Sequence, residues 1–383
     1  MEESKNIHRA VPLNRDLKSS SVLLLGPRRT GKSWLIRNQL QPDQTYNLLR
    51  SDTFQQLSAR PSLIRESLKK TDRLVVIDEI QKLPSLMDEV HLMIEETPVR
   101  FLLTGSSARK LKRTHTSLMA GRAKTRLLFP FSSAELGDLF DLERCLKFGT
   151  LPPVFLADDP EETISTYVGD YLREEIQAEA LTRKIENFSR FLYQAAMTNT
   201  ELINFESIGS DAQVPARTIR EYYRILEDTL LGSCLEPLQT TGKRKAVSHS
   251  KFYFFDIGVA NALLNTFAIT DRHPLYGKNF EHFIYNELRA YLSYFKAKSK
   301  LCFWRTQTGQ EVDFVIDGEI AIEAKATKLA SERDLKGLSA ISSEVPIRRR
   351  ILISRDLHRR HLKGVEIFPI HEFVKELWAG KIF

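Results

Sequence analysis

The fold is decided by the stretch Ser21-Val22-Leu23-Leu24-Leu25-Gly26-Pro27-Arg28-Arg29-Thr30-Gly31-Lys32-Ser33. Its first five residues predict a buried strand, and the residues from Ser33 onward predict the start of a helix. The spacing between them fits G-x-x-x-x-G-K-[ST], a loop whose backbone N–H groups cradle phosphate oxygens at a helix N-terminus. We therefore expect a nucleotide-phosphate site made by Gly26, Pro27, Arg28, Arg29, Thr30, Gly31, Lys32 and Ser33.

A second apolar run supplies the acidic half of the expected site. It reads Leu74-Val75-Val76-Ile77-Asp78-Glu79 and is typical of a strand buried on both faces of a parallel sheet. Ligands bind at the carboxyl ends of such strands. We expect Lys32 to reach the β- and γ-phosphates of ATP, and Ser33 and Asp78 to hold Mg²⁺. Glu79 would polarise the attacking water as general base.

Composition limits the class of protein. The chain has 383 residues, which predicts two to four domains, and its hydrophobic content of 42% and charged content of 27% are typical of soluble globular proteins. A net charge of +7 suggests an anionic partner. We expect a cytoplasmic protein without membrane contact, since neither a transmembrane run nor a signal peptide is evident. Cys145, Cys234 and Cys302 match neither a zinc site nor a disulfide framework and are expected to be buried thiols.

The order of predicted elements divides the chain into four segments. Strand–helix alternation over residues 1–132 predicts an α/β core with a mostly parallel sheet and helices on both faces. Residues 133–185 are expected to form a helical lid, residues 186–270 a winged helix, and residues 271–383 a further α/β domain. The expected strands of the core cover residues 21–25, 45–49, 74–78, 100–104 and 126–129, and its expected helices cover 61–70 and 84–96.

The winged-helix interpretation depends on a short helix at 205–209, a turn, and a longer helix at 215–228. Two strands at 235–238 and 251–255 would follow, with Lys243-Arg244-Lys245 as a basic wing between them. The alternative is a packing module that contacts no nucleic acid.

The last segment contains the spacing D-x₉-E-x-K, formed by Asp313, Glu323 and Lys325. Alternation places Glu323 and Lys325 on one strand face. Two carboxylates and a lysine could bind Mg²⁺ and activate water against a phosphodiester, with Glu281 as a further ligand. The alternative is an ion pair between Glu323 and Lys325 on a solvated face. We expect surface charge at Glu287, Asp317 and Glu319.

These motifs, with Leu103-Thr104-Gly105-Ser106-Ser107 and Met119-Ala120-Gly121-Arg122, resemble the AAA+-like P-loop ATPases. More narrowly, the chain resembles a prokaryotic family whose C-terminal domain has a restriction-endonuclease-like fold. Residues 253–258, 277–281 and 311–314 carry that likeness, which covers nearly the whole chain.

The resemblance implies roles for particular residues. Thr104 or Ser106 would be the sensor beside the γ-phosphate. Arg122 would be an arginine finger acting across a subunit interface, which implies a homo-oligomeric ring, for example a hexamer; the alternative is a solvated turn residue. Asp313, Glu323 and Lys325 match the PD-(D/E)xK nuclease motif without its leading proline. In such families the nuclease is often lost while the fold persists as a DNA-binding module, and the intact acidic pair and lysine leave catalysis open here.

Basic segments favour DNA as the anionic partner, because phosphate contacts dominate affinity for nucleic acid. The leading hypothesis is therefore an ATPase that remodels or translocates DNA, including branched DNA, with a tail that binds or cuts it. The alternative is an ATP-dependent switch or scaffold whose inactive nuclease-like tail binds a protein partner. The segments are Arg109-Lys110, Lys112-Arg113, Lys243-Arg244-Lys245, Arg348-Arg349-Arg350 and the stretch from Arg355 to Lys363.

Overall fold

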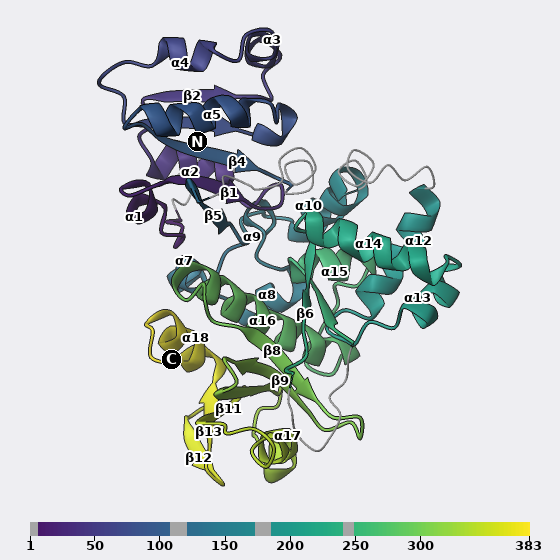
Figure 1. The fold of residues 1–383 in the computed structure, drawn as a ribbon. Coiled ribbons are helices and arrows are strands. Elements are labelled where there is room, and N and C mark those ends of the chain that lie inside the picture. Colours follow the sequence, from purple (N-terminus) through teal and green to yellow (C-terminus); the bar gives the residue numbers. More distant parts are fainter. Residues whose placement is uncertain (1–6, 108–120, 173–184, 240–248) are drawn as a thin grey trace. The chain divides into compact units, whose positions relative to one another are not determined.

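A computed structural model describes residues 7–107, 121–172, 185–239 and 249–383. They fall into two compact units (Figure 1). The first unit ends at Phe131 and includes Asp228–Leu231, and the second comprises Ser132–Glu227 and Gly232–Phe383. The expected basic segments at 109–113 and 243–245 lie outside the described residues, as do Met119 and Ala120 of the motif that contains Arg122.

The first unit is built on a five-stranded sheet in the order β2-β3-β4-β1-β5. All four strand pairs are parallel, which confirms the predicted α/β core. β1 is buried along its whole length, and β3 and β4 are buried beyond their first residue, as expected for strands covered on both faces. The strands are β1 Ser21–Leu25, β2 Gln44–Asn47, β3 Leu74–Asp78, β4 Arg100–Gly105 and β5 Ala123–Leu127.

β5 begins three residues before the predicted start at 126. The prediction missed the start of β5 because Lys124 and Arg126 interrupt the apolar pattern of a buried strand. β5 is an edge strand, and both side chains form ion pairs with the buried Asp16 carboxylate, at 3.0 and 2.6 Å. Burial raises the pKa of Asp16, and the two neighbouring bases lower it. The net result is a pKa below the usual value for aspartate.

Helices α3, α4 and α5 bury apolar side chains against one face of this sheet, where Leu57, Ile64 and Val90 join a single core cluster. α1 packs against β1 and β4. The predicted helix at 61–70 is shorter, and α3 was not predicted, because its sequence SDTFQQLSA buries only Leu57. The helices are α1 Leu13–Leu17, α2 Lys32–Gln39, α3 Ser51–Ala59, α4 Leu63–Ser67 and α5 Leu86–Glu96, with a 3₁₀ turn η1 at Ile80–Lys82.

The second unit begins with helices. The described part of the helix expected at 161–180 is α10 followed by a π-helical segment. The predicted short and long helices near 205 and 215 are confirmed as α13 and α14. The helices are α7 Ser133–Leu136, α8 Leu142–Phe148, α9 Pro152–Phe155, α10 Pro160–Thr166, η3 Tyr167–Leu172, α12 Ile185–Met197, α13 Phe205–Ala212, α14 Ala216–Asp228, α15 Ile257–Leu263 and α16 Pro274–Phe295, with a 3₁₀ turn η2 at Gly137–Leu139.

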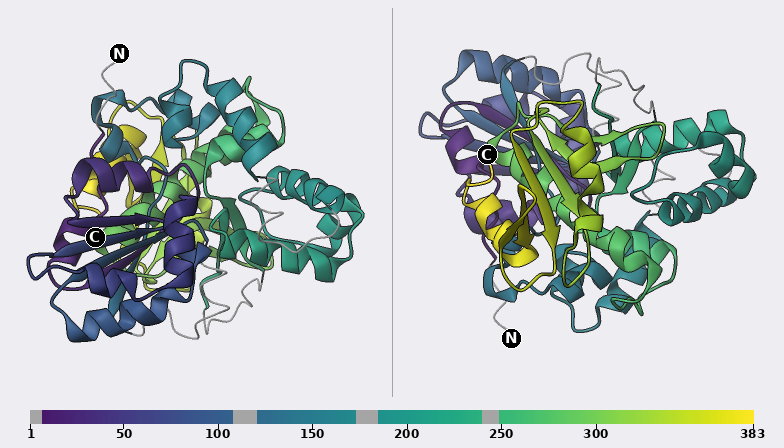
Figure 2. Two further views of the ribbon diagram at one scale, coloured as in Figure 1. Left: turned by 90° about the horizontal axis from the view of Figure 1, so that it is seen from above. Right: turned by 90° about the horizontal axis from the view of Figure 1, so that it is seen from below.

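A six-stranded mixed sheet closes the second unit, in the order β12-β13-β11-β10-β9-β8. α17 packs against β9 and β10, while α18 packs against β11 and β13 (Figure 2). β12 was not predicted, because residues 355–363 were interpreted only as a basic stretch, and no element was predicted for the residues that form β13 and α18. The strands are β8 Leu301–Arg305, β9 Glu311–Ile316, β10 Ile320–Ala324, β11 Arg349–Ser354, β12 Arg360–Leu362 and β13 Val365–Pro369; the helices are η4 Glu332–Leu335, α17 Lys336–Ile341 and α18 Ile370–Trp378.

A two-stranded antiparallel ribbon stands beside this sheet. It pairs β6 Gly232–Leu235 with β7 Lys251–Phe254. A parallel bridge between Pro237 and Phe303 joins its continuation to β8. The ribbon therefore lies at the β8 edge of the C-terminal sheet.

Candidate functional site

The phosphate-binding loop predicted from the sequence connects β1 to α2. Gly31 has φ +94°, a left-handed conformation that disfavours any residue with a Cβ, and it caps α2 at the point where Lys32 begins the helix. At Gly26 a Cβ would lie 2.6 Å from the Leu128 carbonyl oxygen, so only glycine fits beside the segment after β5. The loop geometry explains both glycines of the motif.

The Lys32 side chain is buried and folds over the loop. Its Nζ donates to the carbonyl oxygens of Gly26 and Pro27, at 2.7 and 3.0 Å. The Thr30 hydroxyl also donates to the Pro27 carbonyl, at 2.9 Å. The ammonium is thus held at the concave side of the loop, where phosphate oxygens would bind. Arg28 and Arg29 are half-buried in the same loop.

Arg9 supports this loop from outside the motif, and no sequence pattern pointed to it. Its guanidinium is 1% exposed and donates to the Thr30 carbonyl at 2.5 Å and the Phe129 carbonyl at 2.6 Å. It also lies over the Phe131 ring, 5.1 Å from the centroid. The buried cation ties the loop to the chain after β5.

The acidic tip of β3 meets the loop as predicted. The Ser33 hydroxyl donates to Asp78 Oδ2 at 3.1 Å, and Thr104 donates to Asp78 Oδ1. β1 and β3 are not neighbours, since β4 lies between them and contributes Thr104. A serine hydroxyl and a carboxylate at one point fit a divalent cation that also takes phosphate oxygens, so Ser33 and Asp78 would hold it.

The carboxylate of Glu79 is held by two partners. Glu79 has φ +63°, a costly conformation for a non-glycine residue that is typical of functional sites. Gln81 Nε2 donates to Glu79 Oε2 and to Ser106 Oγ, the latter at 3.0 Å, and Ser106 Oγ lies 3.3 Å from the same carboxylate. The structure therefore brings Glu79, the expected general base, together with Ser106. It also places Gln81, which was not predicted, in hydrogen-bond contact with both.

Arg122 lies away from this group. It immediately precedes β5, whose first residue pairs with the first residue of β1, so it stands at the amino edge of the sheet. The loop lies at the opposite, carboxyl edge. Arg122 forms an ion pair with Glu95, and both side chains are exposed. Within one subunit it does not belong to the nucleotide site.

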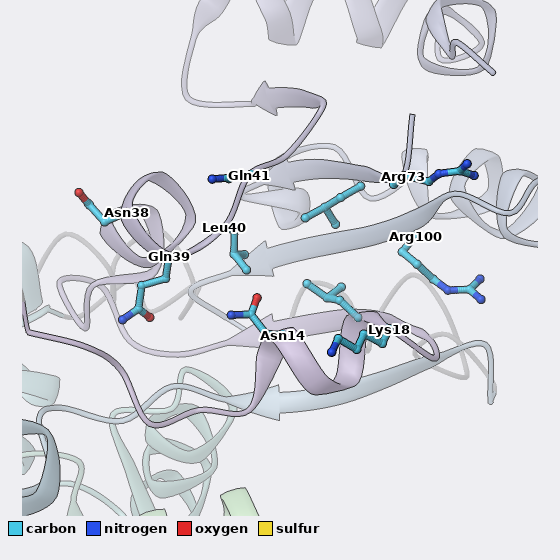
Figure 3. Close-up of a pocket in the computed structure, with 10 residues that line it drawn as sticks. Asn14, Lys18, Asn38, Gln39, Leu40, Gln41, Arg73 and Arg100 are labelled. Atoms are coloured by element: carbon cyan, nitrogen blue, oxygen red, sulfur yellow. The ribbon is translucent and has the colours of Figure 1, made fainter. Parts of the chain in front are cut away.

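A hollow of about 430 Å³ also lies at the amino edge (Figure 3). Leu74 and Arg100 begin β3 and β4 there, and Leu40 follows α2. It is therefore remote from the loop and is not part of the nucleotide site. Its polar lining is Asn14, Lys18, Asn38, Gln39, Gln41, Arg73 and Arg100.

The predicted acidic cluster of the second unit also assembles. Lys325 Nζ lies 2.6 Å from Glu323 Oε1, and the Ala324 N–H donates to Asp313 Oδ2 at 2.9 Å. Burial and the nearby Asp313 carboxylate raise the pKa of Glu323 to about 8. The ion pair of the alternative interpretation is therefore present, but its Glu323 carboxylate is buried while the Lys325 side chain is 39% exposed.

Glu281 joins this cluster from α16, and its carboxylate already forms an ion pair with the Lys251 ammonium. Its Oε1 accepts from Lys251 Nζ at 2.9 Å and from the Tyr253 hydroxyl at 2.6 Å. Burial raises the pKa of Glu281 to about 7, against the lowering effect of Lys251. Among the described residues, no group of three or more His, Cys, Asp and Glu side chains is arranged to hold a metal ion. The Lys251 ammonium lies among these carboxylates, and a Mg²⁺ ion held by Asp313 and Glu323 stays a prediction.

Two expectations about individual residues were wrong. Glu287 is buried rather than on the surface, because Ser133 N–H, Ser133 Oγ and Trp378 Nε1 all donate to it, at 2.8, 2.6 and 2.6 Å. Burial raises its pKa to about 7. Of the three thiols only Cys145 is buried; Cys234 and Cys302 are half-buried.

The basic stretch near the C-terminus is largely neutralised by acidic neighbours. Glu366 forms ion pairs with Arg349 and Arg359, at 2.6 and 2.7 Å, and Asp356 forms one with Arg360 at 2.8 Å. Further pairs join Arg355 to Glu143, Lys363 to Glu332 and Arg348 to Glu319. Arg349, Arg359 and Arg360 are therefore less available to phosphates than the sequence suggested, whereas Lys363 and Arg348 belong to pairs that are more than half exposed and weak.

Comparison with known proteins bears on these sites. Residues 18–137 match the family model described as an AAA domain. This match implies nucleotide binding with the usual divalent metal, and it suggests nucleotide-dependent ATPase activity. Residues 139–270 and 276–373 match two models, each described as a domain of unknown function (DUF8612 and DUF4143).

Among curated proteins, the chain is 24% identical over 298 residues to an uncharacterized protein of Haemophilus influenzae. That match covers 70% of this chain and 73% of the Haemophilus protein. Among solved structures, it is 12% identical to the Bacillus subtilis DNA clamp loader delta protein (56% of this chain, 86% of that one, TM-score 0.23). It is also 12% identical to Can2 of Sulfobacillus thermosulfidooxidans in complex with cyclic tetra-adenylate (95% and 99%, TM-score 0.23). Both TM-scores are too low to establish a shared fold. No helix among the described residues is long and apolar enough to cross a bilayer.

Proposed function

We propose that this protein is an oligomeric, Mg²⁺-dependent ATPase of the AAA+ type that acts on DNA. The observation that carries the ATPase proposal is the 3.1 Å contact between Ser33 Oγ and Asp78 Oδ2, which joins the phosphate loop to the acidic strand tip. Bound Mg²⁺ would neutralise charge on the phosphates. Lys32 would bind the β- and γ-phosphates, and Glu79 would orient the attacking water.

The DNA part of the proposal is supported by α13 and α14. Gln213, with φ +56°, makes the tight turn between them, and α14 buries one face while it exposes Arg217, Arg220 and Arg224 on the other. Arg220 and Arg224 have acidic neighbours at 3.6 and 2.9 Å, but all four side chains are more than half exposed. Such surface pairs are weak and exchange readily for phosphates. With the β6–β7 ribbon, these helices support a winged helix with α14 toward DNA.

The test is ATP turnover by the purified protein with single-stranded, duplex and four-way DNA. We expect DNA to stimulate turnover, and DNA affinity to fall steeply as salt rises. Lys32→Ala, which removes the phosphate-binding ammonium, is the negative control. If none of the three DNAs changes turnover or shifts in mobility, the DNA proposal fails while the ATPase proposal stands or falls on Lys32→Ala.

A second candidate is an ATP-dependent switch or scaffold that binds a protein partner. The neutralised bases of the C-terminal stretch favour it, because they leave fewer sites for phosphates. It predicts ATP-dependent assembly without stimulation by DNA. DNA-stimulated turnover that disappears in Arg122→Ala would count against it.

A further inference from the structure

Lys251 lies in the middle of the acidic cluster of the second unit. It is the first residue of β7, and its side chain is 3% exposed. Its Nζ lies 2.9 Å from Glu281 Oε1, 2.5 Å from Glu311 Oε1 and 3.7 Å from Asp313 Oδ1. The ring of Phe303 covers it, 5.7 Å from the centroid. One ammonium thus gathers carboxylates from α16 and β9.

The cluster as a whole is nearly neutral without any metal. Lys325 pairs with Glu323 at 2.6 Å and Arg305 with Glu311 at 2.7 Å, so with Lys251 three cations face the four carboxylates of Glu281, Glu311, Asp313 and Glu323. A divalent cation would add two positive charges beside the Lys251 ammonium. That repulsion in a buried site costs several kcal/mol.

We propose that Lys251 is a built-in counter-ion that takes the position of a divalent cation, so that the C-terminal unit binds its partner without cutting a phosphodiester. One carboxylate oxygen, Glu323 Oε2, is buried without a hydrogen-bond partner in the structure. The other oxygen of Glu323 pairs with Lys325, and Asp313 Oδ1 lies 3.7 Å from Lys251, so the carboxylates that would hold a cation already face ammonium groups. The inference goes beyond the proposed ATPase and does not depend on it.

Removal of the ammonium should open the site. Lys251→Met keeps the length of the side chain and deletes the charge, which leaves Glu281, Glu311 and Asp313 without their shared cation. These carboxylates should then take a divalent cation from solution. Asp313→Asn keeps an oxygen acceptor for the Ala324 N–H and removes a charge that the cation would need.

The experiment is titration of the full chain with Mn²⁺ in the absence of nucleotide, read by electron paramagnetic resonance of the free ion. We expect wild type and Asp313→Asn to bind Mn²⁺ equally weakly. Lys251→Met should gain one site at least about 100-fold tighter, and Lys251→Met/Asp313→Asn should lose it again. Lys298→Met, which removes an exposed lysine of the same unit, is the matched control and should resemble wild type.

Three results would each overturn the proposal. The first is a stoichiometric Mn²⁺ site in wild type that Asp313→Asn abolishes. The second is Mn²⁺-dependent DNA cleavage by wild type that Lys325→Ala abolishes, and the third is a folded Lys251→Met that gains no site. If Lys251→Met does not fold by circular dichroism, Lys251→Gln serves in its place, and the comparison of wild type with Asp313→Asn remains decisive. ATP turnover is not a readout here, so failure of the ATPase proposal would be seen separately.

Discussion

Replacement of Arg122 by alanine separates a subunit-spanning role from a local one. Arg122 pairs with Glu95, and the side chains are 39% and 55% exposed, so the pair contributes under about 1 kcal/mol to stability. Along the five residues of β1, the amino and carboxyl edges of the sheet are about 13 Å apart. Arg122 therefore acts on the phosphates of a neighbouring subunit or not at all.

If Arg122 is an arginine finger, Arg122→Ala should fold normally and lose about 1,000-fold in turnover. Lys32→Ala should be equally inactive, because it cannot hold the phosphates. In a ring assembled from equal amounts of the two variants, about one quarter of the interfaces combine an intact Lys32 with an intact Arg122. The mixture should then recover about one quarter of wild-type turnover.

Steady-state phosphate release from the two variants, alone and mixed, measures this directly. Arg60→Ala is a matched control, since it removes another exposed arginine that pairs with an acid in the same unit. The subunit-spanning role is refuted if the mixture is no more active than the two variants measured apart, or if Arg122→Ala alone keeps most of the turnover.

Three further outcomes are expected. Glu79→Gln should bind ATP with wild-type affinity in fluorescence titrations and turn it over at least about 100-fold more slowly, since it lacks the base; turnover near wild type would contradict that role. Arg9→Ala should lower the free energy of unfolding in urea by about 3 kcal/mol, because it leaves buried carbonyls of the loop and of the chain after β5 without their donor; a loss under about 1 kcal/mol would contradict the supporting role of Arg9. Burial raises the pKa of Glu287 in the folded state to about 7, from an ordinary 4.5, so the folded state binds the proton more tightly than the unfolded state. The free energy of unfolding should therefore fall by about 3 kcal/mol as the pH rises from 4.5 to 7. The difference between wild type and Glu287→Gln, measured by urea unfolding at pH 4.5 and 8, should show that slope, and a flat difference would contradict it.

Prediction from the sequence succeeded where the signal is local. The apolar runs of β1, β3 and β4 and the loop between Gly26 and Ser33 were predicted because strand burial and glycine conformation are written into neighbouring residues. β5 was misplaced, since an edge strand needs no apolar pattern and its bases pair with Asp16. β12 was missed for the same reason, since it is an edge strand within a stretch that looked only basic.

The residues that hydrogen-bond to or pair with the predicted site residues could not be predicted from the sequence. Gln81 is two positions from Glu79, but nothing in the sequence showed that its amide meets Ser106. Lys251 gathers carboxylates that lie thirty or more positions away, and Arg9 holds a carbonyl 120 positions away. Each pairing depends on which strands are neighbours.

By itself, the sequence determined the class of the first unit and the location of its phosphate loop, since a glycine spacing and an apolar run act over a few residues. The tertiary structure alone decided the charge of the second unit's acidic cluster. A carboxylate in water can pair with any cation, but Glu281 and Glu311 are paired with a lysine from a distant strand, and only the packing of β7 beside β9 and α16 brings that lysine there.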